Sequence, residues 1–160
     1  MKNFFFYDPK LLLYGFLIIF FASYGQTFFI SLFNTEIRKF YGLSDGEFGL
    51  VYAVATLLSS FLLISFAKLI DHLDLRFYSF IITLGFLFAC LGMVLLINNI
   101  LYLFLVIFML RFFGQGAMDH AGGTTMARYF GNDKGKALSV ATLGGMIGVM
   151  FLPYFALNFF

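Results

Sequence analysis

The chain has 160 residues, of which 62% are hydrophobic and 22% aromatic, while only 11% are charged. A soluble domain of this size cannot bury so much apolar surface, because small folds leave a large part of their surface exposed. The net charge of +2 is too small to indicate nucleic-acid binding, so no nucleic acid is expected as a partner. The single cysteine, Cys90, excludes an intramolecular disulfide, and two scattered histidines do not form a metal site. No cofactor is expected.

Five apolar segments approach the ~20 residues that a helix needs to cross a bilayer. Polar loops separate them, and they cover approximately residues 11–33, 48–66, 77–97, 100–127 and 137–158. The segments are continuously apolar rather than alternating, a pattern that favours helices over the strands of a membrane barrel. The sequence therefore predicts an all-α, polytopic helical membrane protein, with residues 1–160 forming one transmembrane domain in the lipid bilayer.

The first span follows Asp8 and Pro9, which together form a helix-start signal. Its apolar sequence is interrupted by Gly25 and Gln26. Gln26 either lines a cavity or bonds to a neighbouring helix, and its position favours the two roles equally. A hydrophilic loop is expected over residues 34–47.

The second span begins directly after Ser44 and Glu47, whose spacing is that of a capping box. Four small side chains then recur at helical spacing, namely Gly49, Ala53, Thr56 and Ser60. They share one face of the expected helix, and such a stripe lets a neighbouring helix approach closely. We therefore interpret this face as a helix-packing surface rather than as a ligand site.

The fifth segment carries Gly144 and Gly148, which also permit a close helix approach. Pro153 is expected to kink or end this helix, because proline removes a backbone hydrogen-bond donor. The chain stops within apolar sequence, which suggests a fragment of a longer reading frame.

The basic residues are distributed unequally between the two sides of the membrane. If the N-terminus is cytoplasmic, seven lie inside: Lys2, Lys10, Lys68, Arg76, Arg128, Lys134 and Lys136. Only Arg38 and Lys39 then lie outside. Since cytoplasmic loops carry the excess of lysine and arginine, the N-terminus is predicted to be cytoplasmic, in a plasma or bacterial inner membrane.

The fourth span carries Arg111, which lies well inside an apolar segment. It is about ten residues from the outer end, and a rise of ~1.5 Å per residue places it near mid-depth. Ionisable groups at this depth are costly and mark functional sites. The guanidinium can offer planar, bidentate donors to an anionic substrate in a central cavity. Alternatively, it forms a structural ion pair or a carbonyl clamp, for instance with Asp119 or with a residue outside this chain.

Helical spacing places five residues of this span on one stripe, namely Arg111, Gln115, Met118, Gly122 and Thr125. Asp119 lies at the edge of the stripe, where it is either a protonatable coupling group or a hydrated residue near the cytoplasmic end. We predict a substrate or coupling site formed by Arg111, Gln115, Gln26 and Asp119.

Three local patterns resemble the N-terminal half of a major facilitator superfamily transporter. The loop over residues 67–76, with Asp71 and Arg76, resembles the family signature Gly-x-x-x-Asp-Arg/Lys-x-Gly-Arg-Arg/Lys in a degenerate form. Residues 111–116 resemble the family pattern Arg-x-x-Gln-Gly-x-Gly, with the Gln and Gly positions exchanged. The third pattern starts at Arg128 and is similar to the family's aromatic–Phe … Arg-Gly-Arg/Lys-Ala run.

The resemblance implies a secondary carrier that works by alternating access, with its site between two six-helix halves. The chain would then be part of the N-terminal half, and the remaining half of the transporter would be its partner. In this scheme Asp71, Arg76 and Arg128 belong to a cytoplasmic gate, and Arg111 belongs to the site for a small-molecule substrate. A small organic anion would suit Arg111.

Two other classes of function are weighed against transport. The first is a non-enzymatic membrane scaffold or accessory subunit, or an inactive truncated fragment, whose polar residues only pair helices. The second, an enzyme, is disfavoured because Asp119 and His120 are adjacent and point about 100° apart on a helix. Residues 122–125 also lack the lysine that a phosphate-binding loop requires.

Overall fold

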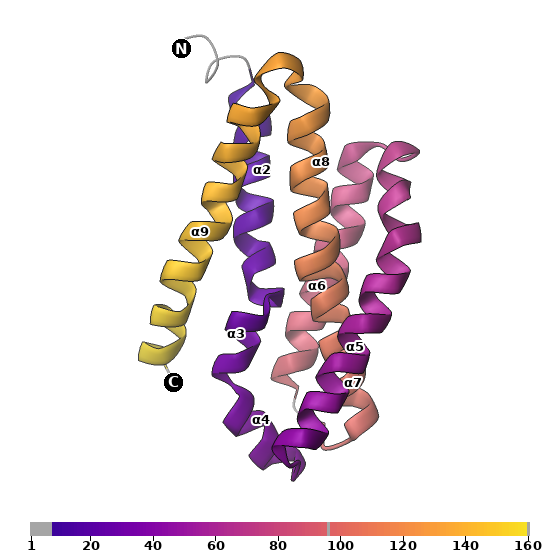
Figure 1. Ribbon diagram of the computed structural model, residues 1–160, viewed down its shortest axis with the longest axis vertical. Helices are drawn as coiled ribbons and strands as arrows, with labels where there is room; N and C mark the ends of the chain where they lie inside the picture. Colours follow the sequence, from indigo (N-terminus) through magenta and orange to yellow (C-terminus); the bar gives the residue numbers. More distant parts are fainter. Residues whose placement is uncertain (1–7, 96, 160) are drawn as a thin grey trace.

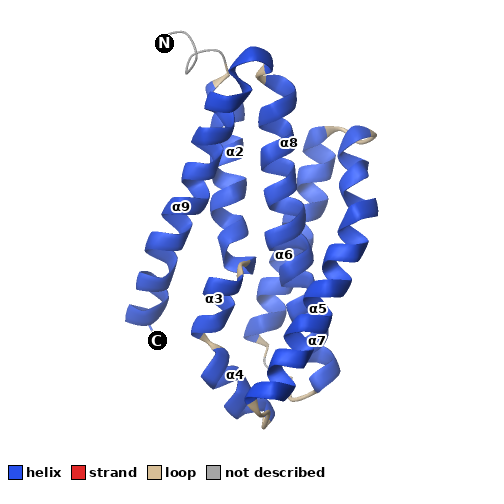
Figure 2. Ribbon diagram, in the orientation of Figure 1, coloured by secondary structure: helices blue, strands red, loops and turns tan. Residues whose placement is uncertain are grey.

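The computed structural model describes residues 8–95 and 97–159, and the secondary structure in these ranges is helical, without a strand (Figure 2). Five helical stretches are long and apolar enough to cross a membrane: Pro9–Leu32, Asp45–Asp71, Leu75–Val94, Ile100–Tyr129 and Gly131–Ala156. The predicted all-α polytopic fold is therefore confirmed. Lys2, which entered the count of basic residues, lies outside the described residues.

The first span is broken in its second half. Its parts are α2 (Pro9–Ala22), the 3₁₀ turn η1 (Ser23–Gly25) and α3 (Thr27–Leu32). The Asp8 carboxylate caps α2 by accepting a hydrogen bond from the Leu11 amide at 3.0 Å. Gln26 is extended, with φ −78° and ψ 153°, so the expected polar interruption separates two helices. Helix α4 (Asn34–Tyr41) then fills much of the segment expected as a loop, and Gly42 ends it in the left-handed conformation (φ 65°).

The second and third spans are long helices with capped starts. They comprise α5 (Asp45–Phe66), the 3₁₀ turn η2 (Ala67–Asp71) and α6 (Leu75–Val94). The predicted capping box is formed, because the Ser44 hydroxyl accepts from the Glu47 amide and the Glu47 carboxylate accepts from the Ser44 amide. Asp74 caps α6 by accepting a hydrogen bond from the Arg76 amide at 2.7 Å. These caps satisfy amides that have no partner inside a helix.

The fourth span contains a long π-helical segment. Its parts are α7 (Ile100–Met109), the π-helix η3 (Leu110–Met118) and α8 (Asp119–Tyr129). The Asn99 side chain caps α7 by accepting from the Leu101 amide at 2.8 Å. π-Helical turns are rare, usually occur singly, and are frequent at functional sites. Nine consecutive residues of this span are wound in this way.

The fifth span packs closely against the first. The turn η4 (Gly131–Asp133) leads into α9 (Lys134–Phe159), which lies beside α2 (Figure 1). A Cβ on Gly144 would collide with the Phe16 carbonyl, and one on Gly148 would lie 2.8 Å from the Ser23 Cβ. Gly144 therefore lets α9 approach the backbone of α2, and Gly148 makes room for the Ser23 side chain.

Helix α9 continues through Pro153. Of the two outcomes expected at Pro153, a kink or an end of the helix, the end does not occur. A proline removes a single backbone donor, and helices in a membrane tolerate this loss when the surroundings satisfy the freed carbonyl.

Helices α2, α8 and α9 lie together on one side of the bundle, whereas α5 lies at the opposite edge, against α7 and η3 (Figure 1). Gly49 and Ala53 are exposed on α5, and a Cβ on Gly49 would meet no atom within 4 Å. The packing role predicted for these two residues has no partner among the described residues. The reason is that the buried side of α5 is a different one, formed by Phe48, Ala55 and Ser59.

Candidate functional site

The breaks in the first and fourth spans touch each other. A Cβ on Gly25 would lie 2.8 Å from the Gly114 Cα and 2.9 Å from the Gln115 amide nitrogen. Only a glycine at position 25 therefore lets η1 approach η3 so closely. Irregular backbone at membrane depth is tolerated where it is buried in protein or lines a cavity. Two irregular segments in contact consequently mark this region as the candidate site.

Arg111, at the start of η3, is held between three spans. Its side chain is buried, with 7% of the residue exposed. Nη1 donates hydrogen bonds to the Gly25 carbonyl and to the Thr27 hydroxyl, both at 3.2 Å. The guanidinium carbon lies 5.3 Å from the ring centre of Tyr52, whose hydroxyl donates to the Thr27 Oγ1 at 2.9 Å. The carbonyl and the hydroxyl thus hold one edge of the guanidinium, and the Tyr52 ring packs against its face.

The other edge of the Arg111 guanidinium has no hydrogen-bond partner among the described residues. Nε is buried and forms no hydrogen bond within the described residues, and no carboxylate there forms a salt bridge with Arg111. The ion pair with Asp119 that the sequence left open is not formed. The clamp alternative describes Nη1, which does bind a carbonyl, but it leaves the Nε–H unsatisfied. A buried donor without an acceptor is costly. We therefore expect this edge to bind an acceptor that does not belong to the described residues.

A small polar cavity lies between α5 and η3 beside Arg111. Its volume is about 140 Å³, and its lining consists of Thr56, Ser59, Ser60, Leu63, Arg111, Gln115 and Gly116. Three residues of this lining each have one buried polar atom without a hydrogen-bond partner among the described residues: Arg111 Nε, Gln115 Oε1 and Thr56 Oγ1. The lining of the cavity therefore combines a fixed cation with polar side chains.

Gln26 and Asp119 form a separate polar contact. The Gln26 Nε2 donates to the Asp119 Oδ2 at 2.8 Å, which joins the break in the first span to the start of α8. Of the two roles considered for Gln26, this contact corresponds to the bond with a neighbouring helix. The two residues lie close to the touching breaks, but neither lines the cavity beside Arg111.

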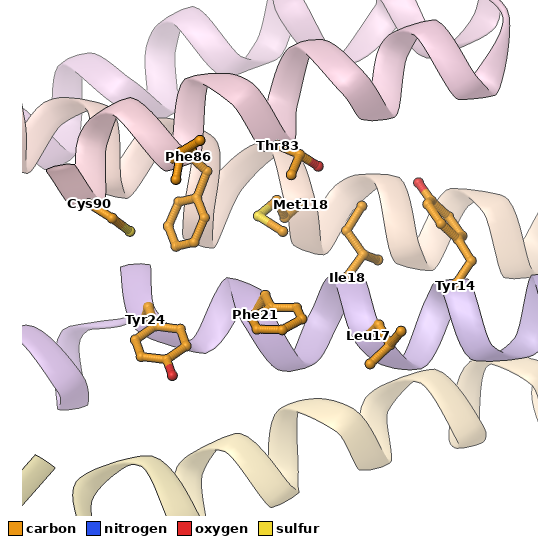
Figure 3. Close-up of a pocket in the computed structure, with 10 residues that line it drawn as sticks. Tyr14, Leu17, Ile18, Phe21, Tyr24, Thr83, Phe86, Cys90 and Met118 are labelled. Atoms are coloured by element: carbon orange, nitrogen blue, oxygen red, sulfur yellow. The ribbon is translucent and has the colours of Figure 1, made fainter. Parts of the chain in front are cut away.

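The five residues placed on one stripe do not share one side. Arg111 and Gln115 face the cavity at α5, whereas Met118 lines an apolar cavity of about 640 Å³ between α2 and α6 (Figure 3). A Cβ on Gly122 would meet Ile19 on α2, which places that residue with Met118. The stripe assumed α-helical spacing throughout. The π-helical turns of η3 hold more residues each, so the register shifts between residues 115 and 118.

The predicted gate residues lie at the end of the bundle where α8 meets η2. Arg128 pairs with Asp71 and donates from Nη1 to the Ile70 carbonyl at 3.1 Å. The pair is exposed, so it contributes little to stability. Arg76 is also exposed, and its guanidinium forms no salt bridge in the part of the chain that the structure describes. The contact thus joins two of the three predicted gate residues.

Sequence reasoning missed most of the residues that surround Arg111 and Gln115. Thr27 and Tyr52 orient Arg111, but nothing in their local sequence indicates this, because they meet it only through folding. Thr56 and Ser60 were interpreted as packing residues, yet they line the cavity together with Ser59. A cluster of hydroxyl side chains one turn apart in an otherwise apolar span is the signal that could have identified them.

The fold and the site define a polytopic helical membrane protein with a buried arginine at a polar cavity. A comparison with known families then gives its identity. The family model of the Major Facilitator Superfamily matches residues 15–159, so the chain belongs to the major facilitator superfamily, a family of membrane transporters rather than enzymes. The predicted membership of this family is thereby confirmed. No similar curated protein and no similar solved structure was found.

Proposed function

We propose that this protein moves a small organic anion across the membrane by alternating access, and that Arg111 binds the anion. The observation that carries this proposal is the buried guanidinium of Arg111, a residue that lines a polar cavity and forms no salt bridge with a described carboxylate. Arginine stays protonated in proteins, and a buried charge is costly unless it is paired. An anion at the free edge would supply both the missing charge and the missing acceptor.

The contact between Arg128 and Asp71 supports a gate at one end of the bundle, to which Arg76 also belongs in this proposal. It ties the connection between the second and third spans to the end of the fourth. An exposed ion pair breaks at low cost. Such a contact can therefore hold one state and release it when the helices move.

The remaining half of the transporter is the partner proposed for α5. Only 11% of the most apolar stretch of the second span is buried. Gly49 and Ala53 lie exposed on this helix, and small residues let a second membrane helix approach closely. A second helical bundle against α5 would also close the site from that side.

The distribution of charge supports a cytoplasmic N-terminus in a plasma or inner membrane. The start of α2, the connection from α8 to α9 and the turn η2 all lie at one end of the bundle, and α4 lies at the other (Figure 1). Arg128, Lys134 and Lys68 belong to the first end, whereas Arg38 and Lys39 belong to α4. An excess of basic residues marks the cytoplasmic side.

The contact between Gln26 and Asp119 is proposed as the coupling element. A carboxylate that accepts from an amide at the break of the first span changes its charge when it binds a proton. This change would act on the same break that carries the Gly25 carbonyl and Thr27, the two partners of Arg111. Proton binding and solute binding would thus be linked through one segment.

Arg111→Lys tests the proposal. Uptake of a panel of labelled organic acids is measured in proteoliposomes that hold the full-length protein. Lysine keeps the charge but cannot offer two donors in one plane, so we expect a loss in kcat/KM of at least about tenfold. Arg38→Lys, the same change on α4 and away from the cavity, should leave uptake unchanged. Uptake that does not depend on Arg111 would refute the site and favour a helix-pairing role, as in a scaffold.

A further inference from the structure

Helix α8 is covered on one side and open on the other. It packs against α2 and α9, and it is drawn between α9 and α5 in Figure 1. Its open face consists of residues that are exposed or half-buried, namely Asp119, His120, Gly123, Thr124 and Ala127. The residues between them are buried: Ala121, Gly122, Thr125 and Met126. We infer that this open face lines a water-filled passage for the solute, and that Gly123 keeps the passage wide.

The passage connects the cavity beside Arg111 with the end of the bundle that carries Arg128. The cavity lining includes Gly116, which precedes His120 by four residues. From His120 to Arg128 the helix advances about 12 Å at ~1.5 Å per residue, while the apolar core of a bilayer is about 30 Å thick. The open face is therefore long enough to reach this end from a cavity near mid-depth. The inference rests on the proposed function, because it names the route by which the same site exchanges its solute.

The side chains of the open face do not suit contact with lipid. Within residues 119–128, all of which the structure describes, no large apolar side chain is exposed. The exposed residues of α6 and α9 include Phe88 and Met150, as expected of helix faces that meet lipid. Ionisable residues within a membrane span face the bundle interior or a water-filled cavity. The open face holds two of them, Asp119 and His120, and is therefore expected to meet water.

Two adjacent glycines of α8 have opposite surroundings. A Cβ on Gly122 would lie 2.6 Å from the Ile19 Cγ1, so the packing against α2 requires a glycine there. A Cβ on Gly123 would meet a single atom, the Leu138 Cδ1, at 3.9 Å, which is an ordinary contact. Packing among the described residues therefore does not require a glycine at position 123, although glycine weakens a helix relative to alanine. A solute that passes in front of Gly123 supplies the missing reason.

A helix of the remaining half of the transporter is the alternative occupant of this face, because small residues also let helices pack closely. Such a helix would exclude water from Gly123, whereas a passage would keep this residue in contact with water. The two ionisable side chains favour the passage, since a packed helix would have to supply partners for both. Reaction with a water-soluble reagent separates the two arrangements.

Cysteine accessibility tests the passage. Gly123→Cys and Phe88→Cys are made separately in the full-length protein with Cys90→Ser, and each is treated in proteoliposomes with a thiosulfonate that carries a trimethylammonium group. Phe88 is the control because it is exposed on the apolar side of α6. We expect Gly123→Cys to react at least about tenfold faster, because a permanent charge does not enter lipid. Equal rates at the two positions would overturn the passage.

Gly123→Leu tests the width of the passage. Because a Cβ fits at this position and leucine favours a helix, the Tm should not fall. The larger side chain fills the passage, so we expect the initial uptake of labelled organic acids to fall at least about tenfold. Gly135→Leu is the matched control, since a Cβ at this position in α9 meets no atom within 4 Å, and its uptake should equal that of the wild type. Unchanged uptake in Gly123→Leu would overturn the role of Gly123.

The inference and the proposed function can fail separately. Slow labelling of Gly123→Cys, with uptake that still falls in Arg111→Lys, would overturn the passage and leave anion transport intact. Fast labelling, with uptake that does not depend on Arg111, would uphold the passage and refute the proposed binding site.

Discussion

Replacing Gly25 by alanine should destabilise the contact between the first and fourth spans. The new Cβ would lie 2.5 Å from the Leu110 carbonyl oxygen, 2.8 Å from the Gly114 Cα and 2.9 Å from the Gln115 nitrogen. All three atoms belong to backbone, so no side chain can rotate away and the two segments must separate. Overpacking of this kind costs ~1–3 kcal/mol, and rigid neighbours place Gly25→Ala at the upper end, about 3 kcal/mol. The ratio of folded to unfolded protein would fall roughly 100-fold.

The assay is denaturant unfolding of the full-length protein in detergent micelles, followed by circular dichroism. Gly49→Ala is the matched control, because a Cβ there meets no atom within 4 Å and α5 gains a better helix former. This control should be neutral or more stable by up to ~1 kcal/mol. Separation of η1 from η3 also moves the Gly25 carbonyl away from Arg111, so Gly25→Ala should reduce uptake as well. Equal stability of the wild type and Gly25→Ala would refute the close contact.

Two further predictions concern single polar contacts. Thr27→Val removes one acceptor of the Arg111 Nη1 and the acceptor of the Tyr52 hydroxyl. We therefore expect a loss of ~1–3 kcal/mol in the free energy of unfolding and a higher KM for uptake. An unchanged KM would show that Thr27 does not orient Arg111. Asp71→Asn breaks the exposed pair with Arg128, so stability should change by no more than ~1 kcal/mol while exchange between inward-open and outward-open states is impaired. Alkylation of cysteines introduced on the two sides measures that exchange, and a normal rate would contradict the gate.

The spans could be predicted because their signal is local. Long apolar runs, the break at Gln26 and the capping box of Ser44 and Glu47 are each visible within a few residues of sequence. The π-helical winding of η3 could not be predicted in this way. It occurs where the backbone of Gly25 contacts that of Gly114, and these residues lie far apart in the chain.

Only part of the site could be predicted, because only part of it has a local signal in the sequence. Arg111 stands out because a charge in an apolar run is conspicuous in any sequence. The face of α5 that meets it does not stand out, since a helical period identifies which residues share a face but not where the face points. The small residues Gly49 and Thr56 were thus given one role, although Gly49 is exposed and Thr56 lines the cavity.

The break at Gln26 divides the first span into two helices, α2 and α3, that pack against different neighbours. Helix α2 is anchored along its length by α8 and α9, whereas α3 packs mainly against α9 and its own neighbours η1 and α4. The part after the break is therefore the more loosely packed one, and it is joined to the fourth span through Thr27 and Arg111. A swing of α3 would pull on the guanidinium while α2 stays in place. A movement of α3 would thus change the position of the Arg111 side chain through its hydrogen bond with Thr27.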